Sequence, residues 1–162
     1  MTKRVWKAGV VTVVLAAAAL VSAVLAQADN ERGHAVRGGG TSIISGGTGA
    51  PGYVPVLTKV AFNWSGESGR FDCLALAPST PTGPKSGEFD ANAMYVTGAI
   101  TSARVSDSQA VLKGTATVTG LGAGSNQAFT LTVARGGPGA TVVLEVSNMT
   151  FHETLLEGTI DF

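Results

Sequence analysis

Few residues in this chain could carry nucleophilic or acid–base chemistry. The chain has one cysteine, Cys73, and two histidines, His34 and His152. A catalytic thiol needs a base such as histidine within reach and an open, electropositive setting. Cys73 instead lies in the largely apolar stretch RFDCLALAP. We interpret it as a small buried hydrophobe on one strand face, and a Cys73–His152 pair, a reactive thiol and an intermolecular disulfide remain alternatives.

Metal and carboxylate chemistry find little support in the sequence. A zinc site needs about four converging ligands, and one histidine with one cysteine in the predicted domain does not supply them. Paired carboxylates act in catalysis only when they face a common cavity. Glu88 and Asp90 alternate with Phe89 and Ala91, so we expect them on a solvated face. A further acidic set is Glu153, Glu157 and Asp161. The sequence predicts no catalytic, metal-binding or cofactor-binding residue.

The first 28 residues have the order of a secretory signal peptide. Lys3, Arg4 and Lys7 precede an uncharged run from Ala8 to Ala26, which ends in Ala-Gln-Ala. This pattern predicts a cleaved signal peptide at 1–28 and a secreted or periplasmic protein, with membrane contact only through this segment before cleavage. An uncleaved anchor is the alternative, because about 20 apolar residues span a bilayer.

Cleavage would leave an acidic domain. Residues 1–28 hold three of the eleven Lys and Arg residues and none of the eleven Asp and Glu residues, so eight basic groups face eleven acidic ones and the net charge becomes −3. This balance does not favour a nucleic-acid partner. The lone cysteine cannot form a disulfide within the chain, so stability must come from packing.

Residues 29–55 and 56–162 differ in pattern. The first segment is rich in glycine and serine and lacks periodicity, which predicts a disordered tether. The second alternates apolar and polar residues between glycine-rich turns, which predicts a single all-β domain. Short connections favour an antiparallel meander, and closure would remove exposed edges, so we expect a barrel or sandwich of about eight strands. The expected strands are 56–64, 70–77, 88–97, 99–106, 109–119, 127–135, 140–148 and 151–162.

Alternation also predicts which side chains face inward. It places Phe89, Ala91, Ala93 and Tyr95 on one inward face. If the interior held a small ligand, the inward aromatic residues Trp64, Tyr95 and Phe129 would line it.

One stretch resembles a known family. The segment GAITSARVSDSQAVLKGTATVTG, with a strand ending in Thr-Ser, a polar turn and the strand Gly-Thr-Ala-Thr-Val at 114–118, is similar to a hairpin of small secreted bacterial β domains called post-COAP. The resemblance extends loosely from Val56 through Phe71-Asp-Cys-Leu74 to Gly158-Thr-Ile160, and departs at 78–87 and in the ending FHETLLEGTIDF. It implies a secreted β fold and transfers no activity or site residue.

These observations favour a non-enzymatic secreted module with a structural or interaction role, which contacts an unknown surface partner through its sheet faces or through loops such as 78–87. The main alternative is a carrier of a small apolar ligand in a barrel cavity. A barrel enzyme using Tyr95, His152 or a carboxylate is a further alternative. So is a small outer-membrane barrel, with which the C-terminal Phe162 is compatible.

Overall fold

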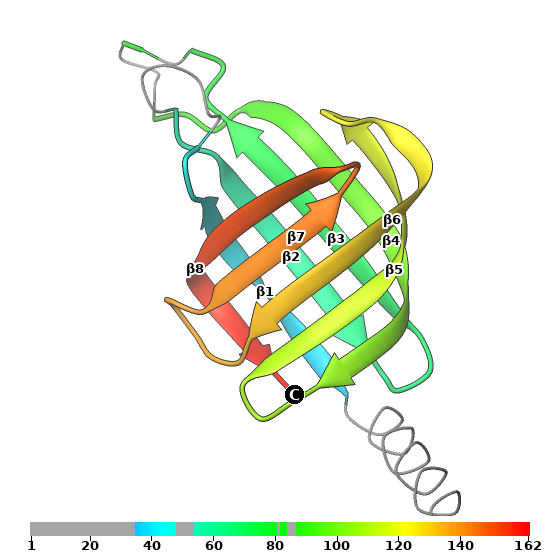
Figure 1. Ribbon diagram of the computed structural model, residues 1–162. Coiled ribbons are helices and arrows are strands. Elements are labelled where there is room, and N and C mark those ends of the chain that lie inside the picture. The colour runs from blue at the N-terminus through cyan, green and yellow to red at the C-terminus, as the bar shows by residue number, and fades with distance from the viewer. Residues whose placement is uncertain (1–34, 48–53, 81, 84–86) are drawn as a thin grey trace, which may run out of the picture.

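The computed structural model describes residues 35–47, 54–80, 82–83 and 87–162, which form a closed antiparallel barrel (Figure 1). Each strand pairs with the next along the chain, and the last pairs with the first. The predicted all-β antiparallel meander is therefore confirmed, and it is closed as a barrel. The eight strands are β1 (Val36–Ile44), β2 (Leu57–Trp64), β3 (Gly69–Ala77), β4 (Ala91–Val105), β5 (Gln109–Gly120), β6 (Gly124–Ala134), β7 (Thr141–Val146) and β8 (Met149–Asp161).

The two ends of the barrel differ. At one end, which we call the loop end, β1 and β3 end, β2 and β4 begin, and the tight turns 121–123 and 147–148 lie. At the other end β1 begins, β8 ends, and the remaining turns join neighbouring strands; the C-terminus is marked there in Figure 1. No helix within the described ranges is long and apolar enough to cross a bilayer.

Alternation along β2 illustrates why these residues form a barrel wall. Thr58, Val60, Phe62 and Trp64 are buried, whereas Lys59, Ala61 and Asn63 are exposed. Because successive side chains of a strand point to opposite faces, one set fills the interior and the other faces outward. The same period runs through the other strands.

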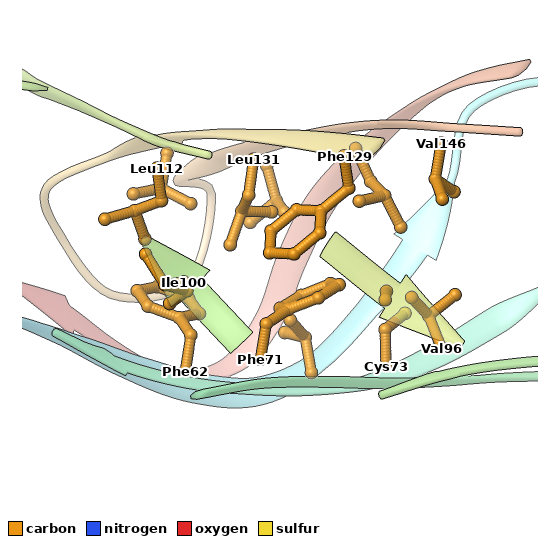
Figure 2. Close-up of a cluster of buried hydrophobic side chains, with 14 of the residues drawn as sticks. Phe62, Phe71, Cys73, Val96, Ile100, Leu112, Phe129, Leu131 and Val146 are labelled. Atoms are coloured by element: carbon orange, nitrogen blue, oxygen red, sulfur yellow. The ribbon is translucent and has the colours of Figure 1, made fainter. Parts of the chain in front are cut away.

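The interior is filled by apolar side chains from every strand. Figure 2 shows part of this cluster. Phe71 and Phe129 point toward one another from opposite walls, and their rings stack with centroids 5.0 Å apart. Gly38 provides the space for a third ring, because a Cβ atom there would lie 2.5 Å from Cζ of Phe62. A large ring is thus accommodated beside a glycine on the neighbouring strand, which lets a small barrel pack solidly.

Strand β1 corrects the expected tether. The stretch VRGGGTSII, within the predicted disordered segment 29–55, forms a nine-residue strand that pairs with both β2 and β8. Its glycines serve close approach rather than flexibility: a Cβ at Gly40 would lie 1.9 Å from the carbonyl oxygen of Glu157. Gly158 opposite has φ 106°, a conformation that favours glycine. The parts of the predicted tether at 29–34 and 48–53, like the predicted signal peptide at 1–28, lie outside the described residues.

Strand β4 corrects a second expectation. The predicted strands 88–97 and 99–106 are one continuous strand with a register shift between Ile100 and Ser102, and residues 88–90 precede it. The expected inward face was also wrong, because Met94 and Val96 are buried and Tyr95 faces outward. The total of eight strands was therefore reached through two compensating errors, one strand missed and one divided.

Candidate functional site

Three polar side chains lie inside the barrel near its loop end. They are Ser42 of β1, Thr58 of β2 and Glu153 of β8, with exposed fractions of 0%, 1% and 4%, and we call them the inner cluster. The Ser42 hydroxyl donates to Glu153 Oε2 at 2.5 Å, and the Thr58 hydroxyl donates to the same oxygen. The cluster thus spans three strands around the junction of β1 and β8, which we call the seam.

Burial dominates the electrostatics of the inner cluster. Desolvation raises the pKa of Glu153, and the hydrogen bonds from Ser42 and Thr58 oppose this shift only in part. Cys73 of β3 is 4% exposed, and its burial, together with the negative charge of Glu153, raises the pKa of the thiol. A thiol in this setting stays protonated, so it behaves as a small hydrophobe rather than as a nucleophile.

A small cavity adjoins the inner cluster. Its volume is about 10 Å³, close to the minimum that one water molecule needs. Its lining is Ile44, Thr58, Cys73, Ala75, Met94, Leu144, Phe151 and Glu153. The described conformation therefore holds nothing larger than water beside the buried carboxyl.

The three aromatic residues predicted to line a ligand site do not share one cavity. Trp64 and Phe129 are buried core residues, 5% and 3% exposed. Tyr95 lies on the outer wall, where its hydroxyl donates to Asp72 Oδ1 at 3.0 Å. None of the three lines the cavity beside the inner cluster.

The alternative Cys73–His152 pair is not formed. Cys73 faces the interior, whereas His152 is exposed on the outer wall between the inward residues Phe151 and Glu153. Among the residues that the structure describes, no group of three or more His, Cys, Asp or Glu side chains is placed to hold a metal ion.

The acidic residues considered as catalytic candidates do not face a common cavity. Asp90 accepts hydrogen bonds from the backbone and hydroxyl of Ser79, each 3.0 Å long, and the backbone bond is the main cause that lowers its pKa. Glu157 and Asp161 are exposed on the outer wall, whereas Glu153 points inward. The sequence did carry a signal for Glu153, because it alternates in phase with Phe151 and Leu155.

A shallow trough of about 290 Å³ crosses the outer wall over β1, β2 and β3. We call it the outer trough, and its lining is Gly38, Ala61, Phe62, Asn63, Arg70 and Asp72. The strand registers explain its shape. Ala61 pairs with Gly39 on one side and Asp72 on the other, so two small residues lie side by side in this row. Asn63 pairs with Arg37 and Arg70 in the next row.

Another hollow, of about 400 Å³, lies over β6, β7 and β8 at the loop end. Its single charged lining residue is Glu145, and the Ser147 hydroxyl beside it donates to the carbonyl of Gly122 at 2.8 Å. It therefore lacks the paired cation and anion of the outer trough.

Comparison of the chain with known protein families, with curated proteins and with solved structures finds no match.

Proposed function

We propose that this chain acts outside the cytoplasm as a non-enzymatic recognition module that binds its partner on the outer wall of a closed barrel. The observation that carries this proposal is the filled interior. The cavity beside Glu153 measures about 10 Å³, whereas sites for small molecules usually measure about 300–1,000 Å³. This space is too small for such a molecule, which favours recognition on the outer surface.

The distribution of polar side chains supports a barrel surrounded by water. The outer wall carries exposed charges such as Arg37, Lys59 and Asp161, while the inward face is largely apolar. A barrel that faces lipid has the reverse arrangement, with an apolar band outside. The predicted signal peptide accounts for the extracytoplasmic location in this proposal.

The inner cluster fits a structural role in this proposal. Both hydroxyl groups are directed at the Glu153 carboxylate, and the adjoining space does not admit a substrate. Buried polar networks of this kind fix how strands meet, because each partner is costly to leave unpaired. We therefore assign the inner cluster to closing the seam.

The proposal is tested with the protein purified from the extracytoplasmic fraction. We expect saturable co-sedimentation with cell-envelope material of the source organism, and no change in Trp64 fluorescence on titration with a fluorescent fatty acid. Quenching of Trp64 at micromolar fatty acid would replace the proposal with a carrier function. Failure to co-sediment with any envelope fraction would also refute it.

A further inference from the structure

We propose that the outer trough binds a neutral saccharide, with Asn63, Arg70 and Asp72 as the recognising side chains. This inference rests on the proposed recognition function and names its ligand class. It follows from the shape of the trough, from the fixed orientation of its polar groups and from their charge balance.

The trough is built on paired strands, so its side chains have fixed spacing. Asn63 and Arg70 are directly opposite one another on β2 and β3, and Asp72 lies two residues farther along β3 on the same face. Ala61, the cross-strand partner of Asp72, is small and leaves the floor of the trough low there. Sites on regular strands hold their groups more accurately than sites on loops do, because the backbone is restrained by the ladder.

Local hydrogen bonds orient the polar groups. Tyr95 donates to Oδ1 of Asp72 at 3.0 Å, and the Arg70 backbone N–H donates to Oδ1 of Asn63 at 3.2 Å. The second carboxylate oxygen of Asp72 and the amide nitrogen of Asn63 are not used in these bonds. The Arg70 guanidinium takes part in neither the Arg37–Asp161 nor the Lys59–Glu157 ion pair.

The charges indicate the ligand class. Arg70 and Asp72 are the only charged residues that line the trough, and their charges cancel. A cation is attracted by Asp72 but repelled by Arg70, and the reverse holds for an anion, so the pair gives neither ion a net attraction, whereas a sugar hydroxyl both donates and accepts. The Arg70 guanidinium and the Asn63 amide can donate hydrogen bonds, and the Asp72 carboxylate can accept them. Together they can therefore bind the neighbouring hydroxyl groups of a sugar ring.

The volume sets the size of the ligand. About 290 Å³ lies at the lower limit for small-molecule sites. The trough therefore suits one or two sugar rings lying on the wall, and the low floor at Ala61 is the point where a ring would rest.

The test is a titration of the isotope-labelled protein, followed by backbone amide chemical shifts, with four soluble neutral disaccharides: cellobiose, maltose, N,N′-diacetylchitobiose and mannobiose. We expect at least one of them to shift amides of β2 and β3. Asp72→Asn, which keeps the shape and the Tyr95 hydrogen bond, should weaken binding about tenfold. Ala61→Ile should fill the trough and abolish the shifts, whereas the matched control Ala128→Ile, an exposed alanine on β6, should leave them unchanged.

Failure of this inference is distinguishable from failure of the recognition function. If no neutral disaccharide shifts the β2 and β3 amides but Ala61→Ile still abolishes envelope co-sedimentation, the trough binds a partner of another class and the saccharide assignment is wrong. If envelope binding survives Ala61→Ile, the trough is not the site. Equal shifts with glucuronate or glucosamine would overturn the argument from charge.

Discussion

The Ser42 hydroxyl donates a 2.5 Å hydrogen bond to the Glu153 carboxylate across the seam between β1 and β8. Both side chains are buried in an otherwise apolar interior, so the bond links the first strand to the last where no solvent competes. Thr58 completes the arrangement from β2. The seam is therefore specified by side chains as well as by the backbone ladder.

The first prediction concerns the dependence of stability on pH. Because burial raises the pKa of Glu153, the folded protein keeps this proton to a higher pH than the unfolded chain does. The contribution of Glu153 to the free energy of unfolding therefore falls as pH rises from the ordinary carboxyl range near ~4.3 through the raised value. We expect Glu153→Gln to be more stable than the wild type at pH 8, by about 1–3 kcal/mol. Urea unfolding at several pH values measures this difference, which should shrink toward pH 4; a difference independent of pH would contradict it.

The second prediction concerns the donors to that carboxylate. Thr58→Val keeps the volume but removes a hydroxyl that donates to Glu153. We expect a loss of about 1–3 kcal/mol in the free energy of unfolding at neutral pH, because a buried carboxylate loses one donor. Thr117→Val, on an exposed position of β5, is the matched control and should change stability by less than about 0.5 kcal/mol. Equal effects of the two variants would show that the inner cluster contributes nothing specific.

The third prediction concerns the glycines of the seam. At Gly158, with φ 106°, a Cβ would lie 2.1 Å from the carbonyl oxygen of Gly39. Gly158→Ala should therefore cost about 2 kcal/mol or more, because the backbone of β1 or β8 must move. Gly87→Ala serves as the control, since a Cβ there meets nothing within 4 Å. Thermal unfolding of the two variants gives the comparison, and an unchanged melting temperature for Gly158→Ala would argue against close contact at the seam.

The fourth prediction concerns the reactivity of Cys73. Its thiol is buried and its pKa is raised, so a thiol reagent at pH 8 should modify the folded protein only as fast as it unfolds. Addition of denaturant should make labelling fast. As a control, Ala128→Cys in a Cys73→Ala background places a thiol on the outer wall, where labelling should be immediate. Rapid modification of native wild-type protein would show that Cys73 is accessible.

Much of the fold was predictable from the sequence, because apolar and polar residues alternate along a strand that has one buried and one exposed face. Most of β2, β5 and β6 follows from that pattern. The pattern did not predict β1, because its three consecutive glycines resemble a flexible linker. In the barrel these glycines allow β1 to lie close to its neighbours β2 and β8. The pattern failed again at β4, where the face containing Tyr95 carries enough apolar residues to resemble the inward one.

The candidate sites were less predictable. Glu153 alternates with Phe151 and Leu155, so its inward position could have been read from β8, but its partners Ser42 and Thr58 lie more than 90 residues away. The outer trough depends on the register of β1, β2 and β3, which sets Ala61 beside Gly39 and Asp72. A single sequence gives strand faces, whereas register between distant strands depends on packing.

The pairing of the first strand with the last has a consequence for how the protein folds. Ser42 and Glu153 are 111 residues apart, and Arg37 and Asp161 are 124 apart. Hairpins between neighbouring strands form from local contacts, but the seam requires the whole domain to be assembled first, and such non-local pairing slows folding. Until β8 pairs with them, β1 and β7 each present an unpaired strand edge, and a strand of a second molecule can hydrogen-bond to it. Self-association during folding should therefore increase when β8 pairs more slowly with β1 and β7.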